Sequence, residues 1–426
     1  MTEEKLNRYK ALAAQGDTEA QFQLGEYYFA QRSKAETEED EDKVSAECIK
    51  WYTKTAEQGH ATAQRYLGEF HETGICAEED DAEAAKWYRL AAVQGDITAQ
   101  YRLADLLMEG GEEWDADEEE AVKWFKTAAD RGDAESQFRL GEYYLDIEED
   151  EEEAVKWFTL AAEQGEGEAQ LRLGCCYADK EDVEEALKWF KRAAEQDFAE
   201  AQWHLGEYYM YGLGGIDCDE KEGARWLTLA AENDDSSAQY HLGLAYEFGS
   251  GVEKDAETAF KWYKKSAKQD HEEAQTQLGL CYLNGFGTEE NEEKAFKWFK
   301  KAAKNDDSEG QYYLGWCYQN GFGVETNFKK AHKWYQRSAD QGDEDAQERL
   351  KEMTDAFTFS RKPNTEPMPS KCPHCGSSAV KPILYGMPCL ETDLSNYIIG
   401  GCCVYDDSPA WGCESCSARF GRKYVK

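Results

Sequence analysis

The sequence predicts an all-α fold, a right-handed α-solenoid of helix-pair repeats, followed by a small metal-stapled domain built on a β-hairpin. Three observations lead to this prediction. A tryptophan-containing phrase returns at a nearly fixed interval, every proline lies near the C-terminus, and two C-x-x-C pairs follow the repeats. A period of this kind is typical of solenoids, in which each unit buries its apolar face only against its neighbours.

The repeated phrase is A-x-x-x-W-[FY]-x-x-A-A-x-Q-G-D-x-x-A-Q-x-x-L-G-x-x-Y. Its tryptophans are Trp51, Trp87, Trp124, Trp157, Trp189, Trp226, Trp262, Trp298 and Trp334, at intervals of 32 to 37 residues. Each unit is expected to contain a helix A, with the A-Q-x-x-L-G-x-x-Y segment, and a helix B, with the tryptophan. We expect nine full units, preceded by a B-type helix near Lys5–Ala14 and closed by an A-type helix near Glu344–Met353.

Small and aromatic residues within the phrase are expected to pack the core. A glycine follows the helix A leucine in eight units, and Ala104 takes this place in the ninth. The small residue lets helix B approach closely, and aromatic residues at helical spacing fill the space between units. Two short units, around 144–157 and 177–189, lack the G-x-G loop. Their helices should persist with shorter connections.

This pattern resembles the Sel1-like repeat family, whose members are related to tetratricopeptide repeats. The resemblance covers about residues 5–353. Members of the family act as adaptors and scaffolds, so the resemblance implies a protein-binding function. One secreted branch carries a paired cysteine in each helix of a unit, and this chain lacks that pattern. Its seven repeat cysteines follow no pairing rule, which fits a reducing cytoplasm.

The distributions of charge and of proline both distinguish the C-terminal residues from the repeats. Residues 361–426 carry eight basic and six acidic side chains, so the remaining residues hold a net charge of −42 within a total of −40. Such a surface repels phosphate backbones and attracts basic proteins. All seven prolines follow residue 362, which leaves the repeats free of helix breakers. We therefore predict a solenoid at 1–353, a linker at 354–370 and a separate domain at 371–426.

The candidate binding surface consists of the residues two before and two after the helix A leucine, here called the A-helix surface. The first set is Phe22, Arg65, Tyr101, Phe138, Leu171, Trp203, Tyr240, Thr276 and Tyr312, and the second is Glu26, Glu69, Asp105, Glu142, Cys175, Glu207, Leu244, Leu280 and Trp316. The residues predicted to bind a partner are Tyr101, Phe138, Trp203, Tyr240, Tyr312, Trp316, Glu142 and Glu207. The alternative is that these side chains only pack against neighbouring A helices.

The A-helix surface changes character along the chain. Its first two-thirds alternates aromatic residues with carboxylates, which favours a basic, aromatic-tolerant segment. Its last third is apolar and favours a hydrophobic helix or the chain's own tail. The acidic runs 36–42, 112–120 and 146–153 lie between helices A and B. They match no calcium-binding loop and are expected to form a solvated edge.

Two C-x-x-C turns, Cys372 with Cys375 and Cys413 with Cys416, can complete a tetrahedral four-thiolate zinc site. A segment as short as residues 371–426 needs a stabilising metal site of this kind to fold. The segment also resembles small bacterial zinc ribbons in its C-P-x-C-G, Y-G-x-P and P-x-W-x-C-x-x-C motifs, and this resemblance implies no activity. Because four cysteines close the coordination shell, the expected Zn²⁺ is structural.

The expected function is a cytoplasmic, non-enzymatic protein-interaction scaffold. Its solenoid would bind a basic or aromatic-containing protein segment, and its zinc ribbon would be a second docking module. No Walker loop, G-x-S-x-G, Rossmann fingerprint or H-E-x-x-H occurs in the sequence, nor does a membrane-spanning apolar run or an N-terminal signal pattern. The alternative is a nucleic-acid-associated protein that uses the basic residues of the ribbon, Arg419, Arg422, Lys423 and Lys426.

Overall fold

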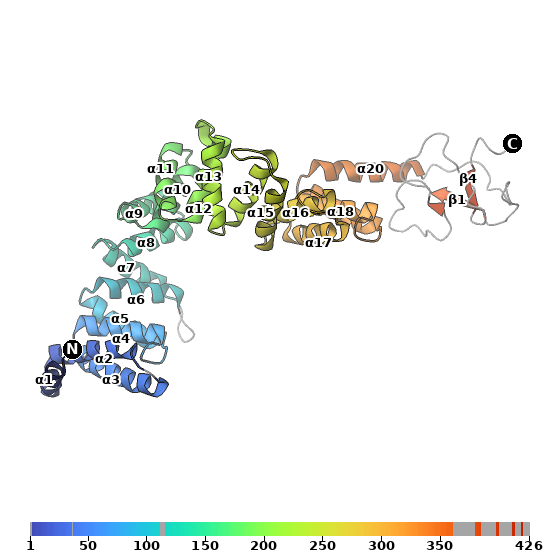
Figure 1. Ribbon diagram of the computed structural model, residues 1–426. Coiled ribbons are helices and arrows are strands. Elements are labelled where there is room, and N and C mark those ends of the chain that lie inside the picture. The colour runs from blue at the N-terminus through green and yellow to red at the C-terminus, as the bar shows by residue number, and fades with distance from the viewer. Residues whose placement is uncertain are drawn as a thin grey trace. The chain divides into compact units, whose positions relative to one another are not determined.

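The computed structural model describes the backbone of residues 2–35, 37–110, 116–360, 380–384, 398–399, 411–413 and 419–420, and the side chains of these residues up to 353. The chain divides into two compact units, Met1–Ala201 and Gln202–Lys426, and each is described by itself. Figure 1 shows that helices make up most of the described part of both units. No described helix is long and apolar enough to cross a membrane.

The first unit consists of alternating B and A helices, and each helix packs chiefly against its neighbours in sequence. Its B helices are α1 (Glu3–Ala14), α3 (Glu38–Glu57), α5 (Asp81–Val93), α7 (Glu118–Ala129), α9 (Glu151–Glu163) and α11 (Val183–Ala194). Its A helices are α2 (Thr18–Arg32), α4 (Ala61–Thr73), α6 (Ile97–Glu109), α8 (Ala134–Asp146) and α10 (Gly167–Asp179). The division between the units falls within the next A helix, α12 (Ala199–Tyr211).

The second unit continues the same alternation. Its B helices are α13 (Glu220–Glu232), α15 (Ala256–Lys268), α17 (Glu292–Ala302) and α19 (Phe328–Asp340), with 3-10 turns η1 (Leu213–Gly215) and η2 (Ala303–Asn305). Its further A helices are α14 (Ser236–Phe248), α16 (Glu272–Asn284), α18 (Ser308–Asn320) and α20 (Glu344–Ser360). The last helix continues to Ser360, into the range predicted as a linker. The all-helical repeat architecture is as predicted.

Four short strands follow the helices. They are β1 (Val380–Leu384), β2 (Ile398–Ile399), β3 (Trp411–Cys413) and β4 (Arg419–Phe420), in the sheet order β2-β1-β3-β4. β1 pairs parallel with β2 and antiparallel with β3, where Val380 faces Cys413, and β3 pairs antiparallel with β4. Of the four predicted zinc ligands, Cys372, Cys375 and Cys416 lie outside the described residues, and only the backbone of Cys413 is described. The zinc site therefore stays a prediction.

Aspartate side chains start most of the helices. The aspartate of the Q-G-D phrase caps helix A: the Asp96 carboxylate accepts the amide N–H of Ala99, and Gly95 before it has a φ of 88°. Asp306, at the position where most repeats have glycine, occupies the same left-handed region with a φ of 65°. Asp150 caps α9, whose first turn is Glu151–Glu153. The described acidic runs thus lie where the helix macrodipole favours negative charge.

The core runs along the contact between A and B helices. The residue after the repeat tryptophan is fully buried in nine B helices. These residues are Tyr52, Tyr88, Phe125, Phe158, Phe190, Leu227, Tyr263, Phe299 and Tyr335. A Cβ atom on Gly279 would lie 2.5 Å from the Cε1 atom of Phe299, which explains the glycine after the leucine. The two short units keep full helices, with connections of only residues 147–150 and 180–182, as predicted.

A buried ladder of glutamines joins consecutive B helices. The glutamine of each A-Q phrase donates its amide to the last carbonyls of the preceding helix B, at 2.9 to 3.1 Å in the first unit. These bonds are Gln21–Ala13, Gln64–Ala56, Gln100–Ala92, Gln137–Ala129 and Gln170–Ala162. Its carbonyl oxygen accepts an amide from the end of the following helix B, as in Gln196 to Gln170 at 3.0 Å. The helix B carbonyls also accept a backbone N–H, as Ala92 does from Gly95 at 2.9 Å, so the glutamine adds a second hydrogen bond and links the helix ends.

The ladder is interrupted once in the first unit. At the end of α7 the repeated glutamine is replaced by Arg131, which donates to the Gly95 carbonyl at 2.6 Å. The carbonyl oxygen of Gln100 is left buried without a hydrogen-bond partner. In the equivalent position Gln196 makes both bonds, to the Gly165 carbonyl at 3.1 Å and to Gln170. A buried acceptor without a partner is unfavourable.

We predict that Arg131→Gln stabilises the protein by about 1 kcal/mol, because the new amide can reach both Gly95 and Gln100. Urea unfolding should show a higher midpoint with an unchanged slope. Arg131→Leu is the matched control, since it removes the guanidinium without supplying a donor, and it should lower the midpoint. Equal midpoints for Arg131→Gln and Arg131→Leu would show that the unpaired oxygen costs nothing.

Candidate functional site

The aromatic members of the A-helix surface differ in accessibility. Tyr101, Trp203, Tyr240, Tyr312 and Trp316 are half-buried, so each presents part of its ring to solvent. Phe138 is only 8% exposed and packs against Phe158, with ring centroids 5.9 Å apart. Phe138 therefore belongs to the core, as the packing alternative expected, and it cannot contact a partner as the surface stands.

In the first unit the carboxylates of the A-helix surface are paired within the chain. Arg139 donates to Asp105 from Nε at 3.0 Å and to Glu142 from Nη1 at 3.2 Å. Arg65 forms an ion pair with Glu69. The Tyr52 hydroxyl donates to Glu26 at 2.5 Å. These acids are thus less available to a basic partner than their spacing alone implied.

The residue immediately before the helix A leucine supplies much of this pairing. This position holds Arg102, Arg139 and Arg172 in three successive repeats of the first unit and His241 in the second. The arginines reach carboxylates of the preceding repeat: Arg102 lies 3.4 Å from Glu72 and Arg172 lies 4.0 Å from Glu142. The predicted binding surface included only the positions two before and two after the leucine, and not the position directly before it. The basic residues become apparent when this position is compared between successive repeats.

A histidine takes the arginine's place in the second unit. His241 Nε2 lies 3.3 Å from Glu207, and the Trp203 indole Nε1 donates to His241 Nδ1 at 3.4 Å. Burial lowers the pKa of His241 and raises the pKa of Glu207. At neutral pH His241 is therefore uncharged, and it does not act as a cationic partner for Glu207.

An apolar cavity adjoins this cluster. It is lined by Met210, Tyr211, His241, Leu244, Ala245, Phe248 and Ser250. Its rim carries two of the more exposed large hydrophobic side chains, Tyr211 at 49% and Phe248 at 68%. The cavity belongs to α12, α14 and the turn after α14.

The last repeats of the second unit combine half-buried aromatic side chains with carboxylates that repel each other. The Trp316 ring stacks on Phe322 with centroids 4.4 Å apart, and Tyr312 packs edge-on against Tyr313. Beside them, burial raises the pKa of Glu309, and the carboxylates of Asp307, Asp343 and Asp345 raise it further. The nearby cation Arg349 is itself paired with Glu352 at 2.8 Å. Negative charge here is therefore incompletely balanced.

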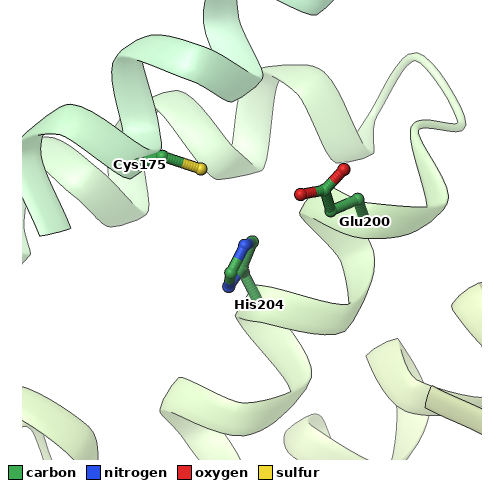
Figure 2. Close-up of side chains that lie close together, drawn as sticks. All are labelled: Cys175, Glu200 and His204. Atoms are coloured by element: carbon green, nitrogen blue, oxygen red, sulfur yellow. The ribbon is translucent and has the colours of Figure 1, made fainter. Parts of the chain in front are cut away.

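Figure 2 shows three further side chains, Cys175 on α10 and Glu200 with His204 on α12. All three carry atoms that can bind metal ions, and a Glu200 oxygen lies within 4.8 Å of the Cys175 sulfur. Burial and, to a smaller extent, the charge of Glu200 raise the pKa of Cys175 to about 11. Burial lowers the pKa of His204 to about 4. At neutral pH the imidazole is in the neutral form that can bind a metal, but the thiol is protonated, and we assign no metal here.

Comparisons with known proteins agree with the repeat architecture. The Sel1 repeat model matches residues 18–60, 61–96, 97–133, 134–166, 167–198, 199–235, 236–271, 272–307 and 308–343. Among solved structures, c5321, a protective antigen of uropathogenic Escherichia coli with an SLR fold, is 27% identical, with a TM-score of 0.52 and coverage of 83% of this chain and 90% of that chain. A Sel1 repeat protein from Oxalobacter formigenes is 27% identical, with a TM-score of 0.42 and coverage of 81% and 89%. No curated protein gives a significant match.

We predict that His204 makes the folding stability depend on pH. Its folded-state pKa of about 4 lies below the ordinary value of 6.5, so between these values the unfolded state binds the additional proton. The stabilising contribution is complete above pH 6.5 and is lost as the pH falls toward 4. Between pH 7 and pH 5.5 the wild type should lose about 1 kcal/mol more than His204→Gln in urea unfolding. Parallel pH profiles of the two proteins would contradict the prediction.

Proposed function

The chain belongs to the Sel1 repeat family, and on this premise we propose that it is a non-enzymatic scaffold that binds a basic protein segment through the A-helix surface of its last repeats. Sel1-repeat solenoids are typically protein–protein interaction scaffolds, which supports the general function. The observation that carries the specific proposal is the combination of half-buried aromatic side chains and unbalanced carboxylates around Tyr312 and Trp316.

The aromatic rings supply an anchoring position. The rings of Trp316 and Phe322 are stacked, and the ring of Tyr312 packs edge-on against Tyr313. All four residues lie on or directly after α18. Large, partly exposed aromatic side chains contribute much of the binding energy at protein interfaces, because they bury wide areas with little loss of conformational freedom. A partner's apolar or aromatic side chain can pack on this group.

The charges favour a basic partner. The pKa of Glu309 is raised partly by Asp307, Asp343 and Asp345, so these carboxylates repel each other in the free protein. A lysine or arginine of a partner would relieve this repulsion. In the first unit a basic partner would instead have to displace Arg139 from Asp105 and Glu142. We therefore place the basic segment on the second unit.

We further propose that residues 371–426 form a structural zinc ribbon held by Cys372, Cys375, Cys413 and Cys416, which acts as a second docking module in the cytoplasm. Support comes from the two C-x-x-C pairs and from the short antiparallel strands β3 and β4. Four thiolates leave no position for a catalytic water.

The binding proposal predicts two separable effects. Trp316→Ala should weaken capture of the partner by about 2 kcal/mol or more at any salt concentration, because it removes the anchor. Glu309→Gln with Asp345→Asn should reduce the salt dependence of binding, with a smaller loss of about 1 kcal/mol. Affinity capture from the source cell identifies the partner, and titration at several salt concentrations measures both effects.

Controls separate binding from folding. Leu160→Ala alters an exposed residue on the B helix α9, 44% exposed, and should leave binding unchanged. Circular dichroism should show that each variant keeps its helix content. If the variants on α18 bind the captured partner as tightly as the wild type does, the A-helix surface of the last repeats is not the binding surface.

The zinc proposal predicts about one Zn²⁺ per chain by metal analysis of the purified protein. The double variant Cys372→Ser, Cys413→Ser should lose this zinc, because each C-x-x-C pair then keeps a single thiolate. Cys218→Ser, which alters an exposed cysteine of the repeats, should retain it. Full zinc retention by the double variant would reject the four ligands.

A further inference from the structure

The three B helices of the last repeats reverse the charge of the earlier ones. α15, α17 and α19 together contain twelve lysine and arginine residues against four aspartate and glutamate residues. The B helices of the first unit that carry the repeat tryptophan, α3, α5, α7, α9 and α11, contain eleven against eighteen. A chain with a net charge of −40 thus carries an excess of positive charge on three successive B helices.

One repeated position accounts for much of this reversal. The residue four before the repeat tryptophan is a glutamate in the first six repeats, namely Glu47, Glu83, Glu120, Glu153, Glu185 and Glu222. In five of these repeats the glutamate pairs with the basic residue directly before the tryptophan, as Glu153 does with Lys156 at 2.7 Å. In the last three repeats the position holds Thr258, Lys294 and Lys330 instead.

The lysines directly before the last three tryptophans therefore lack this partner. Lys261, Lys297 and Lys333 are all exposed. Among the described residues, the only ion pair made by a cation of α15, α17 or α19 is that of Lys301 with Asp270, at 2.6 Å. The exposed cations of these helices are therefore available to a partner, unlike most of their equivalents in the first unit.

The cations of each helix lie in a row along one face. Residues three or four apart are neighbours on a helix surface, so Lys294, Lys297 and Lys301 line up on α17 around the half-buried Trp298. The Lys301 Nζ atom lies 5.4 Å from the centre of the Trp298 ring. The same spacing recurs on α19, and on α15 with Thr258 in the first place. Each tryptophan thus adds apolar area to a positively charged row.

The three rows are neighbours, because consecutive B helices are linked at their ends. Lys301 of α17 pairs with Asp270, which follows α15. Gln341, which follows α19, donates to the carbonyl oxygen of Asp306 after α17 at 2.9 Å. We call the exposed cations of these repeats the basic B-helix surface. It consists of Lys261, Lys264, Lys265, Lys268, Lys294, Lys297, Lys300, Lys304, Lys329, Lys330, Lys333 and Arg337.

We propose that the basic B-helix surface binds an acidic protein segment, rich in aspartate and glutamate. Charge complementarity supports an anionic partner, because these exposed cations form no ion pairs with described carboxylates of the chain. The half-buried tryptophans supply contact area for the methylene groups of the acidic side chains. The proposal is independent of the basic segment proposed above, since no residue of the A-helix surface belongs to the basic B-helix surface. The last repeats would thus connect two partners of opposite charge.

The borders of the basic B-helix surface favour a short protein segment over a nucleic acid. Glu292 and Glu293 lie in the first turn of α17, and Asp340 ends α19. A continuous phosphate backbone that extended beyond the three helices would meet these and further carboxylates of an acidic chain. A few acidic side chains can bind within the three rows. At about 0.1 M salt, charges more than about 10 Å away are largely screened, so close ion pairs outweigh the repulsion by distant repeats.

Binding of a labelled peptide of about ten glutamates to the full-length chain tests the proposal. Fluorescence anisotropy at about 0.1 M salt should detect binding of this peptide and none of the equivalent glutamine peptide. The double variant Lys294→Glu, Lys330→Glu installs the glutamate of the first six repeats, so that Lys297 and Lys333 gain an ion pair. Both substitutions lie in the first turn of a helix, where the macrodipole favours negative charge, and the fold should be retained. The variant should bind the glutamate peptide on the order of ten-fold more weakly.

A matched control separates this surface from total charge. Lys126→Glu with Lys191→Glu makes the same change of net charge on exposed lysines of α7 and α11, and should keep the affinity within about two-fold. Circular dichroism should show that both double variants keep their helix content. Equal binding of the glutamate and glutamine peptides, unchanged binding by Lys294→Glu, Lys330→Glu, or an equal loss in both double variants overturns the proposal.

Two further measurements examine the class of the partner. An oligothymidylate with as many charges as the glutamate peptide should bind more weakly than that peptide, and tighter binding would assign the surface to nucleic acid. Light scattering should show the same molar mass for the wild type and for Lys294→Glu, Lys330→Glu. A wild-type dimer that this variant abolishes would assign the surface to the acidic repeats of a second copy. Either assignment overturns the proposal of a separate acidic segment.

Discussion

The repeat structure depends on one recurring interaction, a buried glutamine that links the ends of two consecutive B helices by hydrogen bonds. The helices are short, so a large share of their backbone lies near an end where intrahelical bonds are missing. In the first unit each A-Q glutamine donates to a carbonyl near the end of the preceding helix B, as Gln137 does to Ala129. All of them except Gln100 also accept an amide from the end of the next helix B, as Gln137 does from Gln164. The apolar core packs the helices, and the glutamines determine which helix end meets which.

Negative charge in this protein has two structural functions before any binding function. Along the edge between A and B helices it stabilises helix starts, as at Glu151–Glu153 in the first turn of α9. On the A-helix surface of the first unit it pairs with arginines of the adjacent repeats, such as Arg139. Around Glu207, where a histidine replaces the arginine, the surface keeps an acid without a cation in that position, and Glu309 beside the last repeats is repelled by neighbouring carboxylates. Total charge alone therefore overstated the acidity of the first unit's surface.

Much of the fold could be predicted from the sequence because the same residue spacing and backbone preferences recur in every repeat. The helix pairs, the glycine next to Phe299, the left-handed Asp306 and the persistence of the short units were all predictable from spacing and backbone preferences. The burial of Phe138 and the salt bridges of Arg139 were not predicted. Each depends on which side chains of different helices meet, and a periodic pattern assigns a residue to a face without identifying its neighbour.

The missing bond at Gln100 has a consequence for the cooperativity of the first unit. In a stack of repeats, stability is approximately a sum of the stability of each repeat and the coupling to its neighbours. The α6–α7 contact lacks the hydrogen bond that Gln100 would accept, whereas the equivalent contacts of the first unit have it. We therefore expect weaker coupling between α6 and α7 than between the other helix pairs of this kind. Partial opening of the stack should therefore begin at α6–α7, and the amide protons flanking this contact should exchange with solvent through local rather than global unfolding.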